Sequence, residues 1–166
     1  MIRVRPGEAA DVDAVLALFD AAQRWLAANG RSGQWGTEPF STNRDQARQF
    51  RDWAINGQLR IAEIDATPVG AVVIGVAPNY APRAVEPELY LQGFVSDRDH
   101  RGHGIGAALI EAARAEAVQR GIGLLRLDCW AGGDGKLVRY YERAGFTRGE
   151  TFTVGSWPGQ LLTRCV

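Results

Sequence analysis

The chain has 166 residues, of which 46% are hydrophobic and 23% charged, and its 19 basic and 19 acidic side chains give zero net charge. This length and balance predict a single globular domain spanning residues 1–166, with enough apolar residues for a buried core. The charge balance argues against a general nucleic-acid-binding protein, which normally carries a basic excess. A small anionic ligand is still allowed, because it needs only a local pocket.

Cysteine content and hydropathy indicate the compartment. The two cysteines, Cys129 and Cys165, do not make a disulfide framework, and no Cys/His cluster has the spacing of a metal site. The N-terminus becomes polar after four residues, unlike a signal peptide, and no apolar run approaches the roughly 20 residues of a membrane span. We therefore expect a cytoplasmic protein without a metal and without membrane or nucleic-acid partners.

Hydrophobic periodicity predicts seven strands and four helices in the order β-α-α-β-β-β-α-β-α-β-β. Thr42-x-x-Asp45 has the form of a capping box and predicts the start of the second helix. This mixture predicts an α/β fold, a mixed sheet with helices on both faces. The expected strands cover residues 2–5, 58–64, 69–76, 88–95, 124–130, 146–154 and 160–166; the expected helices cover 11–29, 43–55, 105–120 and 135–144.

Glycines alternate with other residues at positions 102, 104 and 106, between an expected strand and an expected helix. A helix N-terminus presents N–H groups that have no intrahelical acceptor, together with a partial positive charge. Glycines let phosphate oxygens approach those amides closely, and Ala107 keeps the first turn thin. The segment from Arg101 to Ala107 therefore predicts a pyrophosphate-binding turn.

The sequence of this turn allows two other interpretations. Gly102-x-Gly104-x-x-Ala107 also satisfies the dinucleotide fingerprint. However, the motif lies late in the chain, five residues separate the strand from Arg101, and too little chain follows for a doubly wound fold. The second interpretation is a glycine-rich loop that packs on the sheet without a ligand. A Walker loop is excluded, because no Gly-Lys-Ser/Thr follows.

The run Arg101–Ala107 resembles the R/Q-x-x-G-x-G/A motif of the GNAT superfamily of acyl-CoA-dependent N-acyltransferases. The segment RYYERAGF, residues 139–146, resembles the LYERxGF segment of the same superfamily. The order of the expected elements is also similar to the superfamily fold from end to end. The resemblance implies a V-shaped opening between the fourth and fifth strands, in which acetyl-CoA lies.

The resemblance also implies which residues contact acetyl-CoA. Main-chain groups of Phe94 and Val95 would pair with the pantetheine arm, and Arg101 would assist by charge or by holding the loop. The superfamily often has Asn seven residues before the tyrosine of Y-x-x-x-G-F, where this chain has Asp134, which when ionised accepts but does not donate hydrogen bonds. The expected cofactor-binding residues are Phe94, Val95, Arg101, Gly102, His103, Gly104, Ile105, Gly106, Ala107, Asp134 and Tyr141.

Acyl transfer to an amine requires a proton acceptor for the amine, donors for the oxyanion and a proton for the leaving thiolate. Tyr141, which the resemblance implies to be near the thioester sulfur, is the expected acid. Glu88 is the expected base, directly or through a water, and it shares a strand face with Tyr90. Asp128 is expected to serve structure, and Cys129 to be a buried, inert thiol.

The resemblance also implies that the loop between the first two helices, residues 29–41, shapes the acceptor pocket. Trp35, Glu38 and Tyr90 are the expected substrate contacts. The predicted activity is transfer of the acetyl group of acetyl-CoA to a primary amine of a small molecule or peptide, by direct attack in a ternary complex. The alternative is a non-catalytic acyl-CoA-binding or sensing module on the same fold. A homodimer would cover the sheet edge that the last strands leave.

Overall fold

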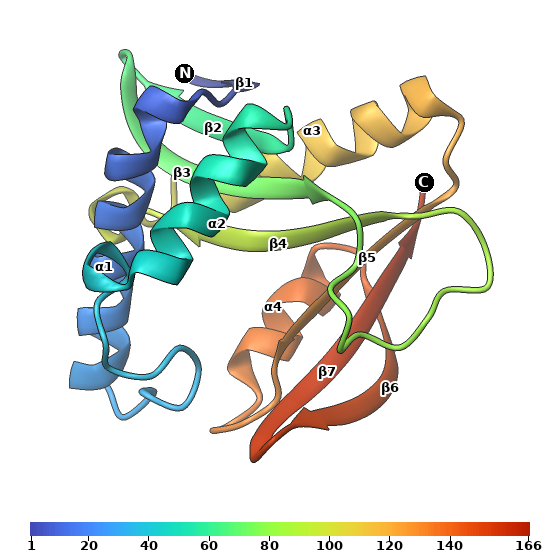
Figure 1. The fold of residues 1–166 in the computed structure, drawn as a ribbon. Coiled ribbons are helices and arrows are strands. Elements are labelled where there is room, and N and C mark those ends of the chain that lie inside the picture. Colours follow the sequence, from blue (N-terminus) through green and yellow to red (C-terminus); the bar gives the residue numbers. More distant parts are fainter. The chain divides into compact units, whose positions relative to one another are not determined.

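The computed structural model describes all 166 residues and contains one seven-stranded sheet. The hydrogen-bonded strand order is β1-β2-β3-β4-β5-β7-β6, and β4 pairs with β5 in parallel (Figure 1). The predicted α/β class with a mixed sheet is confirmed. The strands are β1 (Ile2–Pro6), β2 (Leu59–Ile64), β3 (Thr67–Gly75), β4 (Leu89–Ser96), β5 (Leu124–Trp130), β6 (Thr147–Val154) and β7 (Trp157–Cys165); the helices are α1 (Val12–Ala28), α2 (Arg44–Ile55), α3 (Ile105–Arg120) and α4 (Lys136–Arg143).

The chain divides into two compact units. Unit 1 comprises Met1–Ile74 and Gly93–Ala112, and unit 2 comprises Gly75–Gln92 and Ala113–Val166. Strand β4 and helix α3 each contribute residues to both units. No helix combines the length and the apolar composition that a membrane crossing requires.

The core of unit 1 lies where α1 and α2 cover one face of β2 and β3 (Figure 1). Phe19 of α1 is its centre: the ring centroid of Phe19 lies 4.7 Å from that of Phe40 and 5.2 Å from that of Phe50. These rings, with Leu59 and Val73 of the strands, exclude water from the face. The apolar residues of α1, which recur at helical spacing, therefore lie on one face of the helix and pack in the core, as the sequence predicts.

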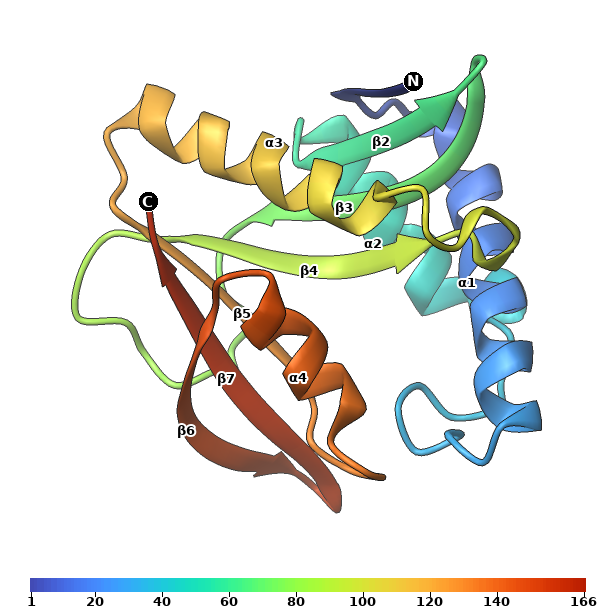
Figure 2. The same ribbon diagram turned by 180° about the vertical axis from the view of Figure 1, so that it is seen from behind.

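The first turns of α3 lie on the opposite face of the sheet in unit 1 (Figure 2). Gly70 of β3 permits this approach. A Cβ at Gly70 would lie 2.6 Å from Cγ2 of Ile105 and 3.3 Å from Cδ1 of Leu109. The missing side chain at position 70 thus sets how closely the N-terminal end of α3 packs on the sheet.

The start of α2 differs from the sequence prediction. The N-cap is Asn43, whose side-chain oxygen accepts hydrogen bonds from the N–H groups of Asp45 and Gln46, each at 3.1 Å. The predicted cap, Thr42, instead donates its hydroxyl to the carbonyl of Pro39 at 3.1 Å, within a short 3₁₀ turn. The capping-box prediction was wrong because two cap-forming residues are adjacent, and the 3₁₀ turn that ends at Thr42 leaves Asn43 with the extended backbone that a cap requires.

Unit 2 is built on β5, which lies between the first residues of β4 and strand β7. Leu89, Tyr90 and Leu91 lie opposite Leu125, Arg126 and Leu127 in the parallel pair, and β5–β7 and β6–β7 are antiparallel. Helix α4 packs on this layer through buried side chains that include Val138 and Tyr141. The last hairpin turns at residues 155–156, so Trp157 begins β7 rather than lying in the turn predicted for 155–159.

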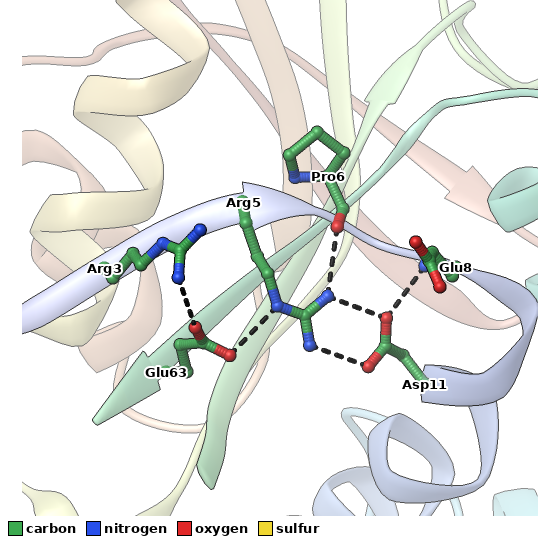
Figure 3. A network of polar contacts seen from close by, with 6 residues as sticks. All are labelled: Arg3, Arg5, Pro6, Glu8, Asp11 and Glu63. Atoms are coloured by element: carbon green, nitrogen blue, oxygen red, sulfur yellow. Dashed lines mark hydrogen bonds and ion pairs between the residues drawn. The ribbon is translucent and has the colours of Figure 1, made fainter. Parts of the chain in front are cut away.

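Arg5 on β1 is the centre of a network of polar contacts in unit 1 (Figure 3). Its guanidinium donates to both carboxylate oxygens of Asp11, at 2.9 and 2.8 Å, and to Oε2 of Glu63 at 2.9 Å. Asp11 also accepts from the N–H of Glu8 at 2.8 Å. The hydrogen bonds from Arg5 hold the pKa of Asp11 below its ordinary value. Arg5 thus ties β1 to β2 and to the entry of α1.

We expect Arg5→Ala to lower the free energy of unfolding by about 2–3 kcal/mol, because it leaves two partly buried carboxylates without their shared cation. Arg3→Ala is the matched control on the same strand. Its side chain is 75% exposed and lies 3.6 Å from Glu63, so the expected loss is below about 0.5 kcal/mol. Urea unfolding of both variants at pH 7 measures the difference, and equal losses would contradict this account of the network.

Candidate functional site

Glycines at positions 102 and 104 belong to the turn that leads into α3, whose place in the fold is seen in Figure 2. Gly102 and Gly104 have φ values of +85° and +80°, and a Cβ at either position would meet no atom within 4 Å. The first helical hydrogen bond runs from the N–H of Ala108 to the carbonyl of Gly104, at 3.0 Å. The N–H groups at residues 105–107 therefore precede the ladder and have no intrahelical acceptor. They lie at the positive end of the helix dipole.

Side chains of the preceding loop hold this turn in place. Asp97 accepts from Nδ1 of His100 at 2.8 Å and from the N–H of Asp99 at 3.1 Å. Nδ1 of His103 lies 2.9 Å from the carbonyl oxygen of His100. The N–H of Asp97 in turn donates to the carbonyl of Val69 on β3, at 2.7 Å. Both histidines thus contribute to the shape of the loop, and the turn is anchored to the sheet.

Arginines surround the same loop in unit 1. The guanidinium carbon of Arg98 lies 3.6 Å from the centroid of the Trp25 ring, a cation–π geometry. Burial lowers the pKa of Arg98, and the nearby charges of Arg101 and Arg31 lower it further. Arg98 and the two arginines whose charges act on it add positive potential beside the glycine turn. An anion bound at this turn would relieve their mutual repulsion.

Glu88 and Arg126 form an ion pair in unit 2. Nη2 of Arg126 donates to Oε1 of Glu88 at 2.9 Å, and Nε of Arg126 donates to Oε2. Arg126 is only 3% exposed, so the carboxylate supplies the partner that its buried charge needs. The hydrogen bonds from Glu88 raise the pKa of Arg126. The guanidinium engages both oxygens of Glu88, and each oxygen keeps a second lone pair that can accept from another donor.

Asp128 and two tyrosines form a second polar cluster in unit 2. The hydroxyls of Tyr90 and Tyr80 both donate to Oδ2 of Asp128, the latter at 3.3 Å. Burial raises the pKa of the Asp128 carboxyl, and the two hydroxyl donors oppose that rise. The sequence predicts only a structural role for Asp128. Arg126 and Asp128 alternate with apolar residues in this strand, which places two charges on one face of β5. That pattern is the sequence feature that could have indicated a polar cluster here.

Tyr141 and Cys129 are both buried and protonated at neutral pH. The Tyr141 ring centroid lies 5.1 Å from that of Tyr140 and 6.0 Å from that of Phe146, and burial raises the pKa of Tyr141 well above its ordinary value. Burial also raises the pKa of Cys129 to about 12. A nucleophilic cysteine needs a depressed pKa, so Cys129 has the environment of an inert thiol.

The remaining predicted residues lie in different surroundings. Oδ1 of Asp134 accepts from the N–H of Lys136 at 3.0 Å, which supports the start of α4. Trp35 is half-buried, and its ring centroid lies 4.9 Å from Phe19, so part of its surface belongs to the core of unit 1. Glu38 is exposed. Unit 1 holds the predicted residues Trp35, Glu38, Phe94, Val95 and Arg101–Ala107, and unit 2 holds Glu88, Tyr90, Asp134 and Tyr141.

Comparison with solved structures shows which fold this is. The chain is similar to a GNAT-family acetyltransferase from Listeria monocytogenes, with TM-score 0.74 and 20% identity over 99% of this chain and 95% of that chain. It is similar to the PaiA N-acetyltransferase of Thermoplasma acidophilum, solved with coenzyme A, with TM-score 0.74 and 16% identity over 100% and 99%. It is also similar to the ribosomal-protein-alanine N-acetyltransferase of Brucella melitensis, with TM-score 0.70 and 20% identity over 99% of each chain. These similarities show a shared fold.

A search of curated protein sequences found no match. The family model described as the acetyltransferase (GNAT) family matches residues 19–146, which is more than half of the chain. This match contains the glycine turn before α3, helix α4 and both polar clusters of unit 2. The chain therefore belongs to the GNAT acetyltransferase family.

Proposed function

We propose that this protein is an N-acetyltransferase that moves the acetyl group of acetyl-CoA to a primary amine by direct attack in a ternary complex. The observation that carries the proposal is the turn before α3. Its two left-handed glycines and its unpaired first-turn amides provide a site for a pyrophosphate. Family membership supports coenzyme A as the source of that pyrophosphate. A relative of the same fold was solved with coenzyme A, as its name states.

The residues of the turn fit this cofactor. Open space lies where a Cβ at Gly102 or Gly104 would point, so phosphate oxygens can reach the backbone. The amides at residues 103–107 would hold the pyrophosphate, and Arg101 would add positive charge. Phe94 and Val95 would contact the pantetheine arm through their main-chain groups, and Asp134 would lie near the cofactor. When bound, acetyl-CoA supplies an activated thioester.

Tyr141 is the proposed acid. Burial keeps the Tyr141 hydroxyl protonated but also makes it a weaker acid, so the proposed donation to the departing thiolate works against its raised pKa. Glu88 is the proposed base, and because Arg126 engages its carboxylate we propose that it takes the proton through a water. Main-chain N–H groups at Phe94 or Val95 would stabilise the developing oxyanion. Cys129 takes no part in the proposed reaction, because a thiol with a raised pKa is a poor nucleophile at neutral pH.

Trp35 and Glu38 are the proposed contacts of the acceptor. Tyr90, the third predicted contact, is fully buried and donates its hydroxyl to Asp128, so it would act only through that carboxylate. Glu38 is exposed and Trp35 half-buried, so both have surface left for a ligand. The acceptor is proposed to be a primary amine of a small molecule or peptide. The homodimer is proposed on the position of β6, which is the last strand of the sheet order and is largely exposed.

Release of free thiol from acetyl-CoA tests the proposed function. The assay compares polyamines, aminoglycosides, amino acids and short peptides as acceptors. We expect at least one primary amine to accelerate thiol release with saturation kinetics. No acceleration in a protein that binds coenzyme A by calorimetry would favour the acyl-CoA-binding module instead.

We expect Gly104→Glu to abolish binding of coenzyme A, since it adds bulk and negative charge at the proposed phosphate site. The substitution also strains a left-handed backbone, so the matched control is Gly57→Glu. Gly57 has a φ of +73° and the same open surroundings, but follows α2. Titration calorimetry with coenzyme A should show normal affinity for the control only. Retained affinity in Gly104→Glu would refute the phosphate site.

We expect Tyr141→Phe to lower turnover by about 10²-fold, with coenzyme A affinity nearly unchanged, because it removes only the donated proton. Tyr140→Phe is the control, since Tyr140 is the adjacent residue and is 38% exposed. Steady-state thiol release by both variants gives the comparison. Equal turnover in wild type and Tyr141→Phe would reduce Tyr141 to a packing residue.

A further inference from the structure

Asp128 has one carboxylate oxygen that no protein donor satisfies. Both tyrosine hydroxyls of its cluster donate to Oδ2, and Oδ1 accepts no hydrogen bond. Every buried side-chain nitrogen and oxygen in the structure has a partner, so Oδ1 must reach solvent. The carboxylate is thus held by two hydroxyls through Oδ2, while Oδ1 has no hydrogen-bond donor from the protein.

Tyr80, which contacts Asp128 through its hydroxyl, is the first of three neighbouring aromatic residues. Tyr80 is 48% exposed, and its ring stacks on Phe152 with centroids 5.9 Å apart and planes inclined by 27°. The Phe152 centroid lies 6.4 Å from that of Trp157 at the start of β7. The loop after β3 therefore meets the last hairpin in three neighbouring aromatic rings. Such rings accept apolar groups on their faces and also attract cations.

The hydrogen bonds to Asp128 come from neutral hydroxyls, and Arg126 acts on its charge without a hydrogen bond to it. The nearest guanidinium, that of Arg126, is already paired with Glu88 through two hydrogen bonds. Its carbon lies 5.4 Å from the centroid of the Tyr90 ring, and Tyr90 is fully buried. Tyr80 and Tyr90 donate to Asp128 but bring no charge. A partly buried anion with one available oxygen is best satisfied by a cation that can also donate a hydrogen bond.

We propose that Asp128 and Tyr80 bind the ammonium group of the acceptor, and that Phe152 and Trp157 receive an apolar stem attached to it. The substrate class is therefore a primary amine carried on an aromatic or alkyl stem. The assignment of this cation as the acetyl acceptor rests on the proposed function. The cation site itself does not depend on that function, because it is argued from contacts within unit 2 alone.

Titration calorimetry with 2-phenylethylamine tests the site, with 2-phenylethanol as the uncharged ligand of matching shape. Each titration is done with and without coenzyme A. We expect wild type to bind the amine at least 10-fold more tightly than the alcohol. Asp128→Asn should bind the amine at least 10-fold more weakly than wild type, with unchanged affinity for coenzyme A. Asp52→Asn, an exposed carboxylate on α2, is the control and should match wild type.

A second variant guards against misfolding of Asp128→Asn. Tyr80→Leu removes a half-exposed ring and leaves Tyr90 paired with Asp128, and it should weaken amine binding about 3- to 10-fold. The proposal is overturned if wild type does not bind the amine, if it does not distinguish amine from alcohol, or if both variants bind like wild type. Amine binding through Asp128 without thiol release from acetyl-CoA would instead contradict the proposed function and leave this site standing.

Discussion

Three residues of parallel pairing between β4 and β5 decide which side chains meet in unit 2. Opposite Tyr90 stands Arg126, and residues two apart on each strand share a face. The pairing therefore gathers Glu88, Tyr90, Arg126 and Asp128 on one face. A slip by one residue would turn these polar groups to the opposite face and replace them with leucines. Both candidate polar clusters depend on this one register.

Burial then forces the polar groups to pair. A guanidinium as buried as that of Arg126 needs an anion, and Glu88 supplies it through both oxygens. This pairing removes one negative charge from the face and leaves that of Asp128, whose hydrogen bonds come from neutral hydroxyls. The face thus holds an ion pair next to an anion whose protein hydrogen bonds all come from neutral groups. For this reason Glu88 and Asp128 are proposed to have different roles, Glu88 as the base and Asp128 as the partner of the ammonium group.

The turn before α3 follows the same rule with backbone groups. The first amides of a helix have no intrahelical acceptor, and a loop that packs another group against them would satisfy them. Here two glycines keep side chains away from that position, and side-chain contacts of Asp97 and His100 hold the loop. The neighbouring arginines add positive charge. These features support the proposal that the turn binds an anion from outside the chain.

Local signals account for the part of the fold that the sequence predicted. Periodicity located all seven strands and four helices, and glycine spacing located the turn before α3. The cap of α2 was misplaced because Thr42 and Asn43 are both good caps, and only the backbone path distinguishes them. The contacts of Glu88 with Arg126 and of Tyr80 with Asp128 join residues 38 and 48 positions apart. Such contacts depend on strand register and on the path of a loop, and neither can be predicted from the residues next to them in the sequence.

The central claim is that the amides at the start of α3 bind the pyrophosphate of coenzyme A. Backbone ¹H–¹⁵N chemical shifts, followed during a titration with coenzyme A, test it residue by residue. The account predicts that Gly104, Ile105, Gly106 and Ala107 show the largest shifts, at the same coenzyme A concentration at which calorimetry shows binding. Saturable binding that leaves these four amides unshifted would contradict it.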